Sequence, residues 1–126
     1  MIELMNLRSH PIHQDNAVRI DRKSKWGNPY KMKTESDRLK VIKKYVYYIL
    51  TNDKLLDSLP ELEEKWLYCW CYPKPCHGSV LKYLCEHPEV IGMYRGKTIS
   101  MDDIVRMIFE ENGWKCESKT QQLTLF

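Results

Sequence analysis

Apolar residues along this chain fall into short runs and into helical repeats, which predict strands and helices respectively. The short runs are Ile2–Leu7, Ala17–Ile20 and Trp66–Cys71, and each has the length of a β-strand. The last run has no alternation of apolar and polar positions. Such a run is typical of a central strand in a parallel sheet, because both faces of that strand are covered.

Helical spacing predicts a helix that Ser36 caps and that ends at Asn52 and Asp53. Its apolar positions are Leu39, Ile42, Tyr45, Val46 and Ile49. The segment Leu55–Glu64 is expected to form a short helix or turn around Pro60.

Two more helices are predicted in the second half of the chain. One begins near Gly78 and ends before Pro88. The other begins after Ser100, which forms a capping box with Asp103, and stops at Gly113. Alternating strands and helices indicate an α/β protein with a small, mostly parallel sheet and flanking helices, either two-layered or Rossmann-like and three-layered.

With 126 residues the chain has the length of one domain. We expect an α/β domain over residues 1–116 and a flexible tail over 117–126. No stretch approaches the ~20 apolar residues of a membrane helix, and the N-terminal residues lack the basic and apolar character of a signal peptide. The five cysteines are an odd number and are unevenly spaced, which favours reduced thiols. A cytoplasmic protein with no membrane partner is therefore expected.

Basic residues are concentrated early in the chain. Ten lysines and arginines lie between Arg19 and Lys44, against three acidic residues. This excess fits either an anionic partner, such as DNA or a nucleotide, or an ordinary solvated surface.

Candidate chemistry centres on the block from Cys69 to Gly78, where a strand, a proline-stiffened loop and a helix start follow one another. Ligands of α/β proteins bind at the carboxyl ends of strands. The field of a helix N-terminus is expected to lower the pKa of the Cys76 thiol, with His77 as its acid or base. Lys74 would neutralise a phosphate, and Gly78 would let a ligand approach the backbone.

Three interpretations of this block stay open. Cys76 and His77 form a nucleophilic or redox site, or the helix start binds an anion or nucleotide. Alternatively, zinc is bound by Cys69, Cys71, Cys76 and His77, although the spacing lacks the usual C-x₂₋₄-C element. We expect no cofactor, with zinc as the exception to test. Cys69 and Cys71 also fit simple packing as small apolar residues.

The chain resembles a small bacterial and phage family known only as a domain of unknown function, whose hallmark is Cys-His-Gly. The resemblance covers about residues 1–85, and its matching residues are Arg22, Trp26, Gly27, Asn28, Pro29, Tyr30, Arg38, Tyr45, Cys69, Cys71, Pro73, Cys76, His77 and Gly78. It implies that residues 26–30 form a second wall of the same site. Trp26 would then either pack in the core or stack on a base, and Arg22 would hold a phosphate.

The last five residues resemble the peptide that binds the bacterial DNA polymerase sliding clamp, Gln-Leu-Ser/Asp-Leu-Phe. The matching residues are Gln122, Leu123, Thr124, Leu125 and Phe126. The resemblance implies that leucine and phenylalanine enter an apolar pocket and that glutamine anchors the peptide. A strand folded back on the domain, or a frayed end, is the alternative.

Together these features predict a protein that docks on the clamp and binds or modifies a nucleotide, a nucleic acid or another phosphate-bearing ligand at the Cys/His site. One alternative is a non-enzymatic clamp ligand that modulates host replication. Another is a zinc-stabilised module that binds nucleic acid.

Overall fold

A computed structural model describes residues 2–8, 15–71 and 74–115, and these contain a three-stranded parallel sheet. The strands are β1 (Glu3–Asn6), β2 (Ala17–Arg19) and β3 (Trp66–Cys69). Their order is β1-β3-β2, and both outer strands pair in parallel with β3. The predicted parallel sheet, with the Trp66 run as its central strand, is confirmed.

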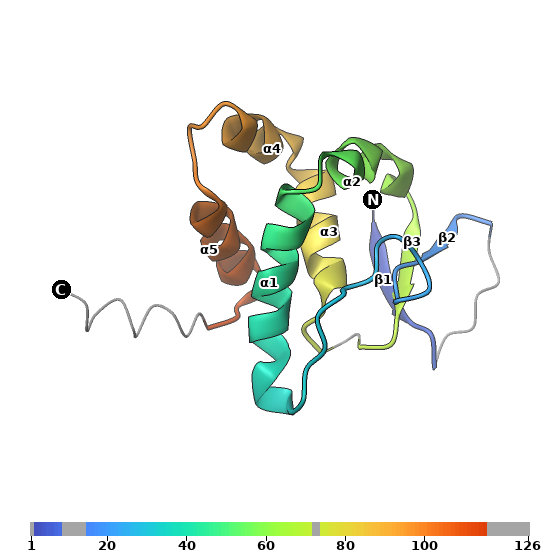
Figure 1. Ribbon diagram of the computed structural model, residues 1–126. Helices are drawn as coiled ribbons and strands as arrows, with labels where there is room; N and C mark the ends of the chain where they lie inside the picture. Colours follow the sequence, from blue (N-terminus) through green and yellow to red (C-terminus); the bar gives the residue numbers. More distant parts are fainter. Residues whose placement is uncertain (1, 9–14, 72–73, 116–126) are drawn as a thin grey trace.

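The described part of the chain forms five α-helices, which lie to one side of the sheet in Figure 1. They are α1 (Arg38–Leu50), α2 (Asp53–Ser58), α3 (His77–Glu86), α4 (Pro88–Arg95) and α5 (Met101–Asn112). Short 3₁₀ turns precede α1 and follow α2, over Glu35–Asp37 and Leu59–Leu62. Helix α3 contacts β1, while α1, α3 and α5 pack on one another. Of the two predicted arrangements, this is the two-layered one.

Local sequence signals set the ends of α5 as predicted. The Ser100 hydroxyl accepts the N–H of Asp103, and the Asp103 carboxylate accepts the N–H of Ser100. Gly113 takes the left-handed conformation that ends the helix, with φ 73°. The expected cap of α1 at Ser36 is wrong, because the 3₁₀ turn places Ser36 before the helix starts at Arg38.

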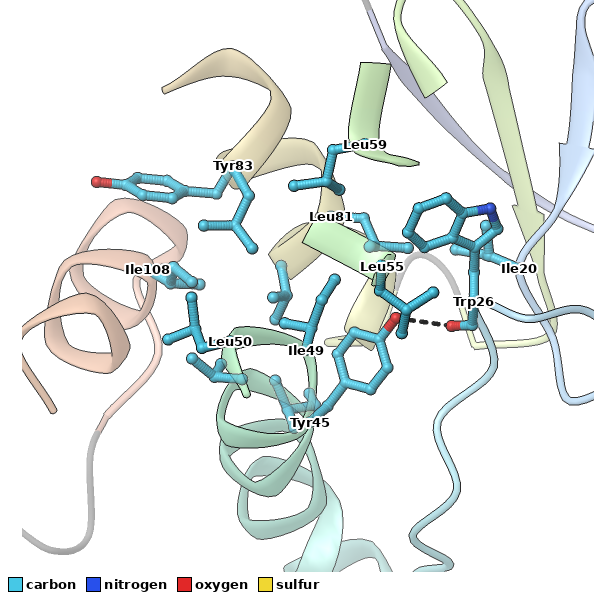
Figure 2. Close-up of a cluster of buried hydrophobic side chains, with 14 of the residues drawn as sticks. Ile20, Trp26, Tyr45, Ile49, Leu50, Leu55, Leu59, Leu81, Tyr83 and Ile108 are labelled. Carbon is cyan, nitrogen blue, oxygen red and sulfur yellow. Dashed lines mark hydrogen bonds between the residues drawn. The ribbon is translucent and has the colours of Figure 1, made fainter. Parts of the chain in front are cut away.

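The hydrophobic core lies where the helices meet each other and the sheet (Figure 2). Tyr45 and Ile49 of α1, Leu81 of α3 and Ile108 of α5 are each fully buried there. The residues that flank the sheet join the same cluster, since Ile20, directly after β2, has no exposed surface. The core thereby fixes the carboxyl ends of the strands against α1 and α3.

Among the residues that the structure describes, no helix combines the length and the apolar character needed to cross a bilayer.

Candidate functional site

A pocket of about 320 Å³ opens at the carboxyl ends of β2 and β3. Its walls come from residues 21–22, 28 and 30–32, from 38 and 41–42 of α1, from 69–71, and from 75–77 at the start of α3. The sequence predicted both principal segments, the Cys69–Gly78 block and the residues around Asn28, and the structure brings them together. In a parallel sheet this edge is the usual place for a ligand.

Among the residues that were predicted to bind a ligand, Trp26 departs most clearly from the prediction. Its side chain is only 2% exposed and belongs to the same buried cluster as Leu55 and Leu81. Its carbonyl oxygen accepts a hydrogen bond of 2.7 Å from the Tyr45 hydroxyl, drawn as the dashed line in Figure 2. Trp26 therefore packs in the core and does not present a ring for stacking.

Gly27 is required for backbone packing. A Cβ atom on this residue would lie 2.6 Å from the Arg22 Cα and 2.7 Å from the Asp21 carbonyl oxygen. Real Cβ atoms do not approach backbone so closely, so only glycine fits. Gly27 thus lets the turn fold tightly against the end of β2, and it does not line the pocket.

Arg22 and Asn28 hold the loop that walls the pocket. The Arg22 guanidinium donates to the carbonyl oxygens of Asn28 and Tyr30, both at 3.2 Å. The Asn28 side chain donates to the Val41 carbonyl at 3.1 Å and accepts the Tyr30 N–H at 2.9 Å. Pro29 between them is exposed and does not line the pocket. Both polar side chains line the pocket while fixing its shape.

Cys76 lies at the N-cap of α3, as predicted, but its thiol is not the acidic one that was expected. Its Sγ is 3.5 Å from the Cys69 Sγ and accepts the Gly78 N–H at 3.3 Å. The hydrogen bond with Cys69 and burial raise the Cys76 pKa well above its ordinary value, despite the opposing contribution of the Gly78 N–H. Burial and the neighbouring Cys69 thiol therefore affect the Cys76 pKa more strongly than the field of the helix N-terminus does.

His77 is 8% exposed and lies at the floor of the pocket. Its Nε2 is 2.6 Å from the Ile20 carbonyl oxygen. Because a carbonyl only accepts, Nε2 carries the proton and Nδ1 is the unprotonated nitrogen of the neutral ring. Burial lowers the His77 pKa, which keeps the ring neutral. His77 therefore supplies one acceptor nitrogen that is not used by Ile20.

Gly78 and Lys74 do not have the roles predicted for them. A Cβ on Gly78 would lie 2.9 Å from side-chain atoms of Ile20 and Leu4, so this glycine allows α3 to pack closely on the strands. Lys74 is exposed, pairs with Glu35 at 3.4 Å and faces a second cavity outside this pocket. Gly78 therefore serves helix packing, and Lys74 forms an ion pair at the surface.

The four residues of the zinc interpretation are not arranged around a common centre. Within residues 2–8, 15–71 and 74–115, no three His, Cys, Asp or Glu side chains are placed to hold a metal ion. The protonated Nε2 of His77 is also turned to Ile20. The neighbouring thiols of Cys69 and Cys76 are both buried.

Arg38, which the resemblance included without a role, joins the two walls of the pocket. Its guanidinium makes two hydrogen bonds to Glu35, at 2.8 and 2.7 Å, and a third to the Pro75 carbonyl at 3.2 Å. The bond to Glu35 raises the pKa of Arg38, and the half-buried Cys71 thiol interacts with the same guanidinium. Arg38 thus ties the start of α1 to the segment before Cys76.

Several residues that line the pocket were given no role from the sequence, among them Lys31 and Met32, and Trp70, which lies inside the predicted Cys69–Gly78 block. The run Trp66–Cys71 was interpreted as one buried strand, whereas β3 ends at Cys69 and leaves Trp70 53% exposed. The signal available was the position of Trp70 just before the proline-rich loop, where a strand has to stop. The predicted clamp-binding residues 122–126 lie outside the described residues.

This arrangement defines a small α/β domain with a ligand-sized pocket at the carboxyl edge of a parallel sheet. The sequence profile of a domain of unknown function, DUF4326, matches residues 5–87, and the chain belongs to that family. The predicted membership in a domain-of-unknown-function family is thus confirmed. The match contains every segment that lines the pocket and ends just after α3.

One relative is the uncharacterized protein R718 of Acanthamoeba polyphaga mimivirus. It is 34% identical over 94 residues, which cover 68% of this chain and 69% of the relative. No solved structure matches the chain.

Proposed function

We propose that the pocket binds a phosphate-bearing ligand, in the class of nucleotides and nucleic acids. The observation that carries this proposal is the charge of its walls. Arg22 and Lys31 line the pocket, and neither forms an ion pair with any residue in the described ranges. Unneutralised cations beside a concave site attract an anion.

Asp21, which lines the pocket, and Glu35, which is bonded to the lining residue Arg38, do not cancel this charge. Asp21 forms an ion pair with Arg19 and accepts the indole N–H of Trp70 at 3.1 Å. Glu35 is engaged by Arg38 and Lys74. Because each carboxylate already has its own cation, Arg22 and Lys31 remain as the excess positive charge.

The phosphate is expected at Arg22 and Lys31 and not at the start of α3. The N–H groups of Gly78 and Ser79 are already accepted by the thiol and the carbonyl of Cys76. Of the two residues predicted to carry chemistry, His77 is the better candidate, because it lines the pocket as a neutral ring and Ile20 engages only its Nε2. A group there would take a proton from a ligand or orient it.

Calorimetric titration with pyrophosphate and with nucleoside triphosphates tests the proposal. Lys31→Gln removes one cation without touching the loop bonds of Arg22, and we expect affinity to fall about tenfold, the value of one charged hydrogen bond. Lys54→Gln, an exposed lysine of α2 outside the pocket, is the matched control. Absence of binding to the unmodified protein, or equal loss in both variants, would overturn the proposal.

A second proposal concerns the C-terminal sequence Gln122–Phe126, which we infer docks on the bacterial sliding clamp. Its support is the near-complete match to the clamp peptide, with Thr124 keeping the hydroxyl of serine. Such a peptide would order on the clamp and bring the pocket to replicating DNA.

Titration of the full chain with purified clamp tests this docking. Deletion of Leu123–Phe126 should abolish binding, and Lys31→Gln should leave it unchanged. Binding that survives the deletion excludes the clamp peptide. A protein that only inhibits replication would need the tail and tolerate Lys31→Gln and changes at His77, whereas one that acts on a ligand would need both sites.

A further inference from the structure

The large apolar side chains that the protein exposes are concentrated at the pocket. In the described ranges these are Tyr30, Met32, Trp70 and Met93, and the first three line the pocket. Scattered exposed apolar residues are normal, but a cluster around one concavity indicates a binding surface. The pocket is therefore apolar and aromatic as well as cationic.

Trp70 is exposed but held in place. Its indole N–H donates to Asp21 at 3.1 Å, and its carbonyl oxygen accepts the Asn6 side-chain amide at 3.2 Å. Asp21 is itself only 8% exposed and is fixed by its ion pair with Arg19. A ring that is bonded through its edge and still 53% exposed offers a preorganised surface for another ring.

Tyr30 contributes a second aromatic group from the opposite segment. Its ring is 38% exposed and packs edge-on against Tyr48, with the ring centres 6.4 Å apart. The ammonium of Lys44 lies 5.6 Å from the same ring centre. Tyr30 is thereby supported from α1, and its backbone oxygen is bonded to Arg22. Aromatic and cationic groups thus occur together on this wall.

We propose that the ligand is a single nucleotide whose base stacks on Trp70 and whose phosphate lies at Arg22 and Lys31. This inference rests on the proposed function and adds the class of ligand. A sugar phosphate would satisfy the cations but leave Trp70, Tyr30 and Met32 uncovered. The volume of about 320 Å³ is at the low end of the ~300–1,000 Å³ of small-molecule pockets, which fits one nucleotide and not a strand.

The test compares AMP, GMP, CMP and UMP with ribose 5-phosphate, using calorimetry on the full-length protein. We expect at least one nucleotide to bind about tenfold or more tightly than ribose 5-phosphate, because stacking on an aromatic residue contributes that much. Trp70→Ala should remove the preference and leave the affinity for ribose 5-phosphate unchanged. Trp70→Phe, which keeps a smaller ring, should restore part of it.

Met93→Ala is the matched control, because Met93 is 40% exposed and lies outside the pocket. It should not change any affinity. Tryptophan fluorescence gives a second readout, since a stacked base should quench Trp70 and the quenching should disappear in Trp70→Phe.

The outcomes separate the two proposals. If ribose 5-phosphate and every nucleotide bind equally, or if Trp70→Ala keeps the preference, the stacking inference is wrong while phosphate binding stands. If a short single-stranded oligonucleotide binds and no mononucleotide does, the single-nucleotide assignment is wrong. If none of these probes nor pyrophosphate binds, the proposed function fails together with the inference.

Discussion

Two segments line opposite sides of the pocket, residues 21–32 and 69–77. They have similar residue types, but the burial of those residues differs. Each leaves the carboxyl end of a strand, carries a tryptophan and passes through a proline. In the first segment the tryptophan is buried, and two of the cationic residues, Arg22 and Lys31, line the pocket. In the second the tryptophan is exposed and two thiols are buried. Similar residue types thus have opposite roles, which are set by the core around Trp26 and by the carboxylate of Asp21 beside Trp70.

Substituting each tryptophan in turn tests this comparison most strongly. Trp26→Ala should lower the free energy of unfolding by about 3–5 kcal/mol, the cost of truncating a large core side chain. Trp70→Ala should lower it by about 1 kcal/mol or less, since it removes one hydrogen bond from a half-exposed ring. Urea unfolding followed by circular dichroism measures both. Similar losses of unfolding free energy in the two variants would contradict the assignment of Trp26 to the core and Trp70 to the surface.

Substitution of the glycine of the first segment, Gly27, gives the next largest effect. Gly27→Ala should cost about 1–3 kcal/mol, because its Cβ would meet backbone at 2.6 Å that no side-chain rotation can relieve. Gly92→Ala is the matched control, since a Cβ there meets nothing within 4 Å and alanine favours the helix by about 0.5–1 kcal/mol. If Gly27→Ala leaves the free energy of unfolding unchanged, the turn does not pack against the end of β2 as closely as described.

The thiols of the second segment should differ in reactivity by about tenfold or more, according to access and protonation. Half-buried Cys71, beside Arg38 at the pocket, should be alkylated before Cys76, which is 2% exposed with a raised pKa. Iodoacetamide labelling of the folded Cys116→Ser variant, followed by peptide mapping, gives the rates. Cys85, whose pKa burial raises to about 12, serves as a slow thiol outside the pocket. If Cys76 is labelled faster than Cys71, the original prediction that Cys76 is the reactive thiol is correct.

The smallest effect concerns the protonation of His77. Burial lowers its pKa in the folded protein, so the unfolded chain binds the proton more readily. Its contribution to stability is therefore complete above the ordinary value near 6.5 and falls as the pH drops from about 7 towards 5. Unfolding at several pH values should show this slope, and His77→Gln, which keeps an N–H donor but has no titratable group, should reduce it. A His77 resonance that titrates above 6.5 would refute the assignment.

The sequence was sufficient for the parts of the fold that depend on neighbouring residues. The apolar run from Trp66 predicted the central strand, and Ser100, Asp103 and Gly113 set α5 because caps act within one turn. Helix α4 was not predicted, since its segment is only eight residues long, contains Gly92 and has a single buried residue, Val90.

The candidate site could be located from sequence but its roles could not be assigned. Strand ends and proline-rich loops place segments in space, which is why the Cys69–Gly78 block was found. Whether a side chain at such a place is buried depends on elements far along the chain. Trp26 stayed open between core packing and base stacking, because the sequence does not show that Tyr45 would bond to it from a helix 19 residues further along. Cys76 was judged by its own helix, whereas the nearby thiol of Cys69 and burial set its pKa.

The strand order has a consequence for how the protein comes to be folded during synthesis. A ribosome makes both outer strands first, and neither pairs with the other, because β3 lies between them. No pair of strands can therefore form until β3 has been made up to Cys69. The pairings of β1 and of β2 with β3, which join residues far apart in the sequence, can then form together. The segment that follows at once, residues 70–77, completes the walls of the pocket, so a nascent chain gains its sheet and its binding site close together in time.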